Sequence, residues 1–529
     1  MKKRCLYLCL LLWLGPAQGK TANSTDLSEL LNRVTPQVLA EFHTPGVTIA
    51  VFDQHQILFH QGYGFRDAER QLPVTTDTYF RIASTTKAIT AASIAILVKN
   101  GRLDWNDRVT DYLPDFRMAT DHLTAQMRII DLLSHNSGLR GGAGDSMLWP
   151  EPASFTPQEI VHNLRYLTPQ SDFRSGFSYS NALYITAAEV VKAVSKMPWA
   201  DFVDSNIFQP LQMHCFAGDV PVTALDAAAL PYGYSEERGI FLIPRNAVLP
   251  QAVHSVAAGG VVCNSEGMVK WLQHLLQIYL GQEHLTGDQA TVNGVISITQ
   301  LNQLWRARTV MPVTDFEQEW HNTALKSYAL GWRLSQFGEH KMLSHTGTLS
   351  GYQAQVALLP DNGIGIVILN NGSNYAVRNS LLYTILHHLL APQSQRDWKQ
   401  VYSDHLQQRL QDYLTNYTAP HGNGIMTHNE DHYIGDYVDK WFGKMAVSKV
   451  DQQLRINSER MPMLSGNLEP FEDNTWVIRW DNENAASVVF IHFTENAAGE
   501  IRQFSISPYR VTPPESHEWQ DMSFIKSAN

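Results

Sequence analysis

The stretch Phe80–Thr90 constrains this chain of 529 residues more than any other part of it. Ser84 and Lys87 stand three positions apart, so a helix that begins near Ser84 places both side chains on one face. The run that follows, Ala88–Val98, is almost entirely apolar, which predicts a helix buried on all sides. Burial at a helix start favours a neutral, proton-accepting lysine beside the hydroxyl. This pattern indicates a serine nucleophile with its own general base.

The Ser-x-x-Lys pattern has a competing interpretation. Serine and lysine are common, so a chain this long carries about one or two such patterns by chance. In that case Ser84 caps a helix and Lys87 is solvated. Two further motifs decide between these alternatives.

The first further motif is Ser178-Tyr179-Ser180-Asn181, which precedes an apolar helix predicted over Ala182–Ser195. Tyr179 offers a phenol that relays a proton, and Asn181 offers an amide that holds a substrate carbonyl. The alternative, without a catalytic role, is a turn with a helix cap.

The second is Ser344-His345-Thr346-Gly347-Thr348, at the start of an apolar strand. Gly347 allows a substrate backbone to approach, and the N–H of Thr348 can face that of Ser84 as an oxyanion hole. We therefore predict Asn181 and the Thr346–Thr348 segment to bind substrate. The alternative, without a catalytic role, is a turn at the start of a strand that happens to contain a histidine.

Ser-x-x-Lys, Tyr-x-Asn and His-Thr-Gly, in this order, resemble the serine β-lactamase and penicillin-binding protein superfamily. The branch of class C β-lactamases, D-alanyl-D-alanine carboxypeptidases and esterases is the most similar. The resemblance covers about residues 28–392, and four other stretches agree with it: Phe80–Ala83, Leu133–Leu139, Pro210–Met213 and Ala257–Gly260.

The resemblance implies a role for each catalytic residue. Ser84 is acylated, Lys87 takes its proton, Tyr179 passes a proton to the leaving group, and Asn181 orients the substrate amide. His345 occupies the place of a lysine in class C β-lactamases, and its charge is expected to change near pH 6.5. The His-Thr-Gly form is similar to D-peptidases and esterases rather than to efficient lactamases.

The order of predicted elements indicates two folded domains. Strands at Thr48–Phe52 and Ile57–His60, and again in the late segments 330–335, 353–359 and 364–369, enclose helices between them. This order predicts one α/β domain, residues 24–393, whose sheet is closed by distant segments. The resemblance implies a β-lactamase-like domain: an antiparallel sheet flanked by helices, with an all-helical lobe.

The residues after that domain have a different sequence pattern and predict different elements. A connecting helix and linker are predicted over residues 394–424. Its apolar residues at helical spacing are expected to pack against another part of the molecule, and they include Trp398, Leu410 and Leu414. Short alternating strands over residues 425–529 predict a small all-β barrel or sandwich, which resembles lipocalin-like domains attached to such hydrolases. Its aromatic residues are expected to form a core rather than a ligand pocket; they are Trp441, Phe442, Trp476 and Trp480. We expect this domain to border the Ser84 cleft or to form an oligomer contact.

The N-terminus indicates export. A basic start, the apolar run Cys5–Leu14 and small residues up to Gly19 predict a signal peptide over residues 1–19. An uncleaved anchor is the alternative. After cleavage the protein is expected to be periplasmic or secreted, with no stable membrane span. Cys215 and Cys263 remain after cleavage. Two buried thiols are expected rather than a disulfide, although the sequence is compatible with either state.

Charge and motif content exclude several partners. A net charge of -11 and a pI near 6.0 argue against nucleic acid. No His-Glu-x-x-His motif or Cys/His cluster indicates a metal, and no cofactor is expected. The substrate is expected to be a small peptide, an ester or a β-lactam, and a homo-oligomer is left open.

These observations together predict an exported serine hydrolase that acts through an acyl-enzyme on a peptide or ester. The alternatives are a class C-like β-lactamase, a non-catalytic protein that binds penicillin or cell-wall peptides, and a structural protein that polymerises.

Overall fold

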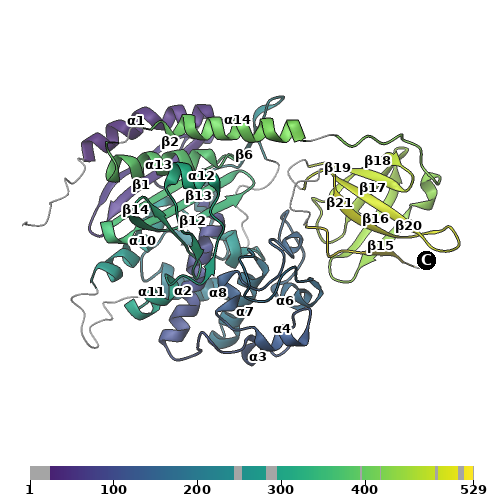
Figure 1. Cartoon of the computed structure of the whole chain (residues 1–529), viewed down its shortest axis with the longest axis horizontal. Helices are drawn as coiled ribbons and strands as arrows, with labels where there is room; N and C mark the ends of the chain where they lie inside the picture. The colour runs from purple at the N-terminus through teal and green to yellow at the C-terminus, as the bar shows by residue number, and fades with distance from the viewer. Residues whose placement is uncertain are drawn as a thin grey trace, which may run out of the picture.

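The computed structural model describes residues 24–243, 253–281, 295–393, 396–416, 419–482, 486–509 and 518–527. The predicted signal peptide, residues 1–19, lies outside the described residues. The described residues form a helix-flanked sheet with a helical lobe, and a closed barrel beyond the end of α14 (Figure 1). Within the described part, no helix has both the length and the apolar character needed to span a bilayer.

The central sheet is antiparallel and is closed by segments far apart in the chain, as predicted. β1 pairs with β2 on one side and with β14 on the other, and β14 continues through β13 to β12. Among the described residues its strands are, in spatial order, β3 (Leu72–Pro73), β2 (Ile57–Asp67), β1 (Gly46–Asp53), β14 (Ile364–Asn370), β13 (Tyr352–Leu359), β12 (His340–Leu349), β11 (Arg333–Phe337), β10 (Ser327–Tyr328) and β9 (Thr309–Val310).

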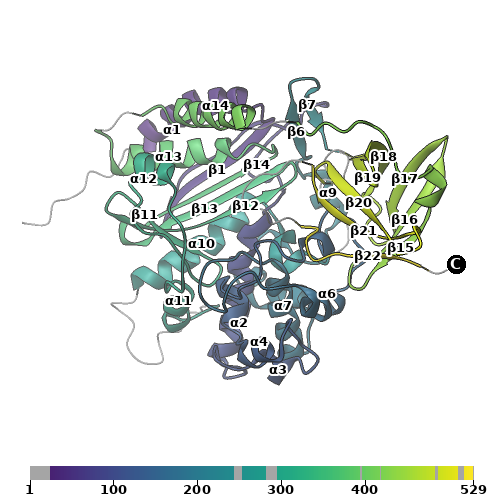
Figure 2. The same cartoon turned by 45° about the vertical axis from the view of Figure 1, so that its right-hand side comes forward.

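Both faces of the sheet are covered, and side-chain alternation divides β1 between them. Val47, Ile49 and Val51 pack into one core, whereas Ala50 and Phe52 pack into another. The first core is covered by α1 (Ser24–Glu41), α13 (Ala376–Leu390) and the start of α14 (Trp398–Asn416). The second is covered by α10 (Ser265–Leu280) and α2 (Thr86–Lys99) (Figure 2). The catalytic candidates Ser84 and Lys87 therefore lie on the α2 side.

The helical lobe packs around α2, whose residues from Thr86 to Leu97 are all buried. Its neighbour α7 (Ala182–Ser195) has the bounds that the sequence predicts. The helix α6 (Pro157–Asn163) begins with a capping box between Thr156 and Glu159. The other α-helices of the described residues are α3 (Val109–Tyr112), α4 (Asp121–Gln126), α5 (Asp131–Ser134), α8 (Trp199–Val203), α9 (Val222–Asp226), α11 (Ile298–Leu304) and α12 (Asp315–His321). Of these, α12 packs against the core under α1 and α13 rather than in the lobe.

A small sheet beside α2 corrects one expectation. β5 (Cys215–Phe216) pairs with β8 (Val262–Cys263), which also pairs with β4 (Phe80–Arg81). Cys215 lies directly opposite Cys263, and the two form a disulfide. The expectation of two free thiols is therefore wrong, because strand register rather than sequence spacing sets the distance between them. A separate hairpin joins β6 (Tyr232–Ser235) and β7 (Gly239–Leu242).

The C-terminal strands close into an antiparallel barrel, which confirms the barrel alternative over the sandwich. In order they are β15 (Gly435–Asp439), β16 (Gly443–Val450), β17 (Gln453–Ser458), β18 (Ser465–Glu472), β19 (Thr475–Trp480), β20 (Val489–Glu495), β21 (Ile501–Pro508) and β22 (Phe524–Lys526). The sequence does not predict β18, which contains Pro470, or the very short β22. The four aromatic residues expected in the core are buried: Trp441, Phe442, Trp476 and Trp480.

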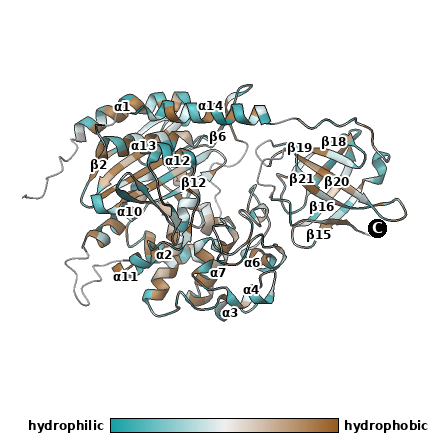
Figure 3. Ribbon diagram, in the orientation of Figure 1, coloured by the Kyte–Doolittle hydropathy of each residue, from teal (hydrophilic) through white to brown (hydrophobic). Residues whose placement is uncertain are grey.

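The connecting helix α14 packs only at its beginning. Trp398 and Tyr402 are buried, whereas Leu410 and Leu414 are each 58% exposed, so the expectation that these two leucines pack is wrong. Figure 3 shows hydrophilic and hydrophobic residues mixed along α1 and α14, as expected for helices that cover a sheet on one side.

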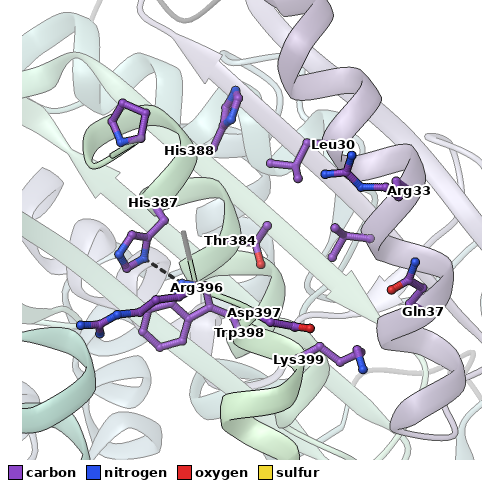
Figure 4. A pocket seen from close by; sticks show the side chains of 12 residues that line it. Leu30, Arg33, Gln37, Thr384, His387, His388, Arg396, Asp397, Trp398 and Lys399 are labelled. Carbon is purple, nitrogen blue, oxygen red and sulfur yellow. Dashed lines mark hydrogen bonds between the residues drawn. The ribbon is translucent and has the colours of Figure 1, made fainter. Parts of the chain in front are cut away.

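A groove of about 620 Å³ lies between α1 and the end of α13 (Figure 4). Arg33 and Lys399 line it, together with His387, whose Nδ1 accepts a hydrogen bond from the indole of Trp398. The groove is on the sheet face opposite to α2, so it is separate from the predicted catalytic residues.

Candidate active site

Ser84 lies on a tight turn that joins β4 to α2. The turn is a short 3-10 segment, Ala83–Thr85, and Ala83 has a positive φ of 48°. A non-glycine residue in this region is strained, and such strain persists only where the surroundings hold it. Here β12 and the segment Val256–Gly260 pack against the turn. The hydroxyl of Ser84 is therefore held at the start of a buried helix, as predicted.

Lys87 is fully buried one turn further along, and its amine has three oxygen neighbours. Nζ lies 3.2 Å from Ser84 Oγ, 2.7 Å from Asn181 Oδ1 and 2.7 Å from the carbonyl oxygen of Ala258. Burial lowers the pKa of Lys87 to about 7, against the opposing charge of Asp145. When the amine is neutral, two N–H bonds point at Asn181 and Ala258, and its lone pair faces the hydroxyl.

Tyr179 and Asn181 come from the loop before α7, as predicted. The phenol of Tyr179 lies beside Ser84, and Lys87 Nζ lies 4.7 Å from the centre of the Tyr179 ring. Burial raises the pKa of Tyr179 well above its usual value, although the neighbouring Ser84 opposes this. The phenol is therefore protonated at neutral pH and can pass a proton on. The structure thus brings Ser84, Lys87, Tyr179 and Asn181 together.

Asp145 is a site residue that sequence reasoning missed. Its Oδ2 accepts a hydrogen bond of 2.9 Å from Nδ2 of Asn181, which fixes the amide with its oxygen toward Lys87. Its other oxygen, Oδ1, is buried and has no hydrogen-bond partner in the described structure. Burial raises the pKa of Asp145 to about 7, against the Asn181 hydrogen bond and the charge of Lys87. A single acid in a glycine-rich loop carries no sequence signal of this role.

His345 lies near Tyr179, but both of its ring nitrogens are paired with other groups. Its Nε2 pairs with the hydroxyl of Tyr328 at 2.9 Å and its Nδ1 with the carbonyl of Thr346 at 2.8 Å. The rings of His345 and Tyr179 have centres 6.5 Å apart. The carbonyl requires a proton on Nδ1, so Nε2 accepts from Tyr328.

Burial lowers the pKa of His345 well below 6.5, and the charges of Arg333 and Lys87 lower it further. The expectation that its charge changes near pH 6.5 is therefore wrong: the imidazole stays neutral because it is fully buried beside cations.

Another imidazole packs against Tyr179. The ring of His135 lies 4.1 Å from that of Tyr179 and 4.4 Å from that of Tyr328, measured between ring centres. Its Nδ1 accepts the backbone N–H of Ser180, which fixes the loop between the two predicted polar residues. Burial lowers the pKa of His135 well below 6.5. His135 belongs to the Leu133–Leu139 stretch that the family resemblance singles out.

Gly347 is where β12 meets the Ser84 turn. A Cβ there would lie 2.3 Å from the carbonyl oxygen of Ile82 and 2.9 Å from the side chain of Ala83. The glycine therefore permits contact with the nucleophile's own segment, a reason different from the substrate approach that the sequence suggested. Thr348 is exposed at the same end, and the guanidinium of Arg378 donates to the Gly347 carbonyl and to Thr348 Oγ1 from behind the strand.

Arg333 on β11 is a second residue that sequence reasoning missed. Its guanidinium donates to Thr346 Oγ1 at 2.5 Å, and it forms no ion pair with a carboxylate in the described part of the chain. Its charge lowers the pKa of both Lys87 and His345, so it lies close to both. A lone cation in an otherwise apolar predicted strand is the signal that could have found it.

Comparison with known proteins finds two family models that match this chain. The model of the family described as Beta-lactamase matches residues 31–390, and a domain of unknown function, DUF3471, matches residues 420–524. A protein named unguisins hydrolase ungD', from Aspergillus campestris, is 29% identical over 75% of this chain and 72% of its own. Penicillin-binding protein 4* of Bacillus subtilis is 24% identical over 63% of this chain and 70% of its own.

Two solved structures share the fold. An octameric penicillin-binding protein homologue from Pyrococcus abyssi has a TM-score of 0.58 and 18% identity, over 95% of this chain and all of its own. A D-amino acid amidase from Ochrobactrum anthropi has a TM-score of 0.56 and 22% identity, over 70% of this chain and all of its own. The sheet, the helical lobe and the family match over residues 31–390 together show that this chain belongs to the Beta-lactamase family, within the superfamily of serine β-lactamases and penicillin-binding proteins.

Proposed function

We propose that this protein is a serine hydrolase that acts through an acyl-enzyme on peptide or ester substrates. The observation that carries the proposal is the contact between Ser84 Oγ and the buried amine of Lys87, at 3.2 Å and with a pKa of about 7 for that amine. A neutral lysine takes the hydroxyl proton as Oγ attacks the substrate carbonyl. The N–H groups of Ser84 and Thr348 stabilise the oxyanion that forms.

The second half of the reaction uses Tyr179. The protonated phenol next to Ser84 passes a proton to the leaving amine or alcohol, and Lys87 replaces it with the proton taken from the hydroxyl. A water molecule then attacks the acyl carbonyl and gives its proton to the same pair, which releases the acid and restores Ser84. Asn181, fixed between Lys87 and Asp145, holds the substrate amide.

Arg333 favours a substrate with a free carboxylate. Its guanidinium has no acidic partner among the described residues and lies beside Thr346, in the predicted substrate-binding segment. An arginine binds a planar carboxylate with two parallel hydrogen bonds, which a neutral ester group cannot provide. We therefore place a D-Ala-type peptide first and a simple ester second. A lactam carboxylate fits the same position, so a class C-like β-lactamase or a penicillin-binding protein without turnover remains the alternative.

Labelling with a fluorescent fluorophosphonate and a fluorescent penicillin tests the proposal. Wild type is expected to be labelled, and Ser84→Ala is expected to lose the label. Ser93→Ala is the matched control, because Ser93 is a buried serine of the same helix that bonds to Thr90 and Trp199 instead. Labelling that survives in Ser84→Ala would refute the assignment.

A substrate panel then separates the alternatives. Peptides ending in D-Ala are compared with their C-terminally amidated forms and with short-chain esters, in wild type and Arg333→Gln. The proposal expects turnover of the free-acid peptides and a loss confined to them in Arg333→Gln. Slow release of penicillin without peptide turnover supports a binding protein, and fast release supports a lactamase.

Export is a further part of the proposal. The basic and apolar N-terminal residues support it, and so does the Cys215–Cys263 disulfide, since disulfides persist in oxidising compartments. Cell fractionation and N-terminal sequencing are expected to find the chain outside the cytoplasm, beginning after residue 19. An intact N-terminus in the membrane fraction supports the uncleaved anchor instead.

The oligomeric state is proposed to be a small homo-oligomer. The octameric homologue shares the fold over nearly the whole chain, and Leu410 and Leu414 are exposed on α14. Light scattering is expected to show a small, defined particle. Filaments would support the structural protein that polymerises.

A further inference from the structure

The barrel touches the part of the hydrolase fold that holds the active site. Its segment after β21 carries Asp521, whose Oδ2 lies 3.3 Å from Nη2 of Arg140. The two side chains are only 6% and 4% exposed. The backbone N–H of Thr168 donates to the other carboxylate oxygen, and the indole of Trp441 donates to the Asp521 carbonyl. Asp521 is therefore held by the lobe through its carboxylate and by the barrel through its backbone.

Arg140 belongs to a loop, residues 138–149, that we call the site loop. The loop supports the catalytic residues by three contacts. The N–H of Gly142 donates to the carbonyl of Tyr179 at 2.9 Å, and the hydroxyl of Ser178 donates to the carbonyl of Leu139. Asp145 accepts the hydrogen bond from Asn181 described above. The loop therefore fixes the backbone at the phenol and the side-chain amide beside Lys87.

The pairing of Arg140 with Asp521 has an electrostatic reason. A second carboxyl of the barrel, Glu518, also lies near Arg140, and burial raises the pKa of Glu518. Among the described residues, the carboxylate within ion-pair distance of Arg140 is that of Asp521. A guanidinium this deeply buried needs an ionised, hydrogen-bonded partner, since an unpaired buried charge is strongly unfavourable. If Asp521 loses its charge, Arg140 has to move toward water and the site loop has to move with it.

We propose that Asp521 of the C-terminal barrel is a positioning residue of the active site, acting through Arg140 and the site loop on Tyr179 and Asn181. The inference rests on the proposed function, because it assigns the barrel a part in the same reaction. A hydroxyl, amine and phenol that act together are sensitive to small displacements, and a shift of about 1 Å costs roughly 100-fold in rate.

The test uses the full-length chain and three variants of the pair. Asp521→Asn removes the charge but keeps an oxygen for the N–H of Thr168, and Arg140→Gln removes the other partner. The double variant shows whether the two act through each other. The matched control is Arg460→Gln, which breaks another ion pair between barrel and lobe, Arg460 with Glu159 at 3.0 Å, on α6 rather than on the site loop.

Two measurements are made on each variant. Hydrogen exchange by mass spectrometry follows backbone protection over residues 138–149 and 178–183, and needs no assumption about the reaction. The rate of fluorophosphonate labelling follows the reactivity of Ser84. We expect Asp521→Asn to exchange faster in both segments and to label about 10- to 100-fold more slowly. The double variant is expected to be no worse than the more affected single variant, because both changes break one interaction.

The control separates positioning from general stability. Arg460→Gln is expected to lower the melting temperature without changing exchange in the site loop or labelling of Ser84. Unchanged exchange in Asp521→Asn overturns the inference, and so does faster exchange with full labelling. Equal losses in Asp521→Asn and Arg460→Gln also overturn it, because they show only weakened docking. If wild type is not labelled at all, the proposed function fails, and the exchange data alone judge whether Asp521 holds the site loop.

Discussion

At the scale of single residues, the site depends on how burial changes proton affinity. Lys87 and Asp145 are both moved toward a pKa of about 7, from opposite directions, by removal from water. Asn181 lies between them and accepts from one while donating to the other. Two groups coupled in this way titrate together, so the apparent pKa values of the reaction belong to the pair.

Asp145→Asn tests this coupling. The substitution keeps an oxygen for Asn181 but removes the negative charge that raises the pKa of Lys87. Lysine must lose its proton to act as a base, so the rate rises with pH through its pKa. The rising limb is expected to move to lower pH in Asp145→Asn, measured as the pH profile of labelling. Glu189→Gln, an acid on α7 paired with Lys192, is the control that leaves the limb in place.

His345→Gln tests the neutral imidazole. Glutamine can accept from Tyr328 and donate to the carbonyl of Thr346, as the Nδ1–H form of histidine does. Because burial keeps the pKa of His345 well below 6.5, the pH profile above pH 6 should keep its shape. The loss in rate should stay below the roughly 100-fold that loss of a general base costs. Disappearance of a limb near pH 6.5 would restore the titrating role that the sequence suggested.

At the scale of elements, the site forms where β12, the Ser84 turn and the loop before α7 meet. The turn is held between β12 and the segment Val256–Gly260, and α2 carries Lys87 into the interior. None of these elements forms the site alone. Their approach depends on the absence of a side chain at Gly347.

Gly347→Ala tests that approach. The added methyl would lie 2.3 Å from the Ile82 carbonyl, so β12 must move away from the turn. Overpacking of this kind costs about 1–3 kcal/mol, and labelling of Ser84 should fall more than this loss of stability explains. Urea unfolding and labelling rates measure the two effects. Gly176→Ala is the control, because nothing lies within 4 Å of its Cβ position; equal behaviour of the two variants would contradict the interpretation.

At the scale of the whole molecule, buried neutral histidines tie folding to pH. Burial lowers the pKa of His321 to about 3, although Glu317 opposes the shift. In the unfolded chain its pKa is about 6.5. Below that pH the unfolded state binds a proton that the folded state does not, so the stability present above pH 6.5 is lost as the pH falls toward 3.

His321→Gln tests this link. Each histidine that stays neutral costs the fold about 1.4 kcal/mol per pH unit below 6.5. Urea unfolding between about pH 7.5 and about pH 5 is therefore expected to show a smaller loss of stability in His321→Gln than in wild type. His122→Gln, an exposed histidine, should behave as wild type. An equal pH dependence in all three proteins would remove His321 from the explanation.

The sequence by itself determined the local elements and the types of residue at the site. The apolar run after Ser84 predicted α2, the apolar run after Asn181 predicted α7, and alternating strands predicted the barrel, because these depend on neighbours in the chain. The structure brings four predicted residues into contact: Ser84, Lys87, Tyr179 and Asn181.

Only the tertiary structure decided the rest. It paired Cys215 with Cys263, kept His345 neutral and brought Asp145 and Arg333 to the site. It also placed Asp521 of the barrel against Arg140. The physical reason is common to all of these: strand register, distance and burial arise from segments far apart in the chain, and no local pattern of residues records them.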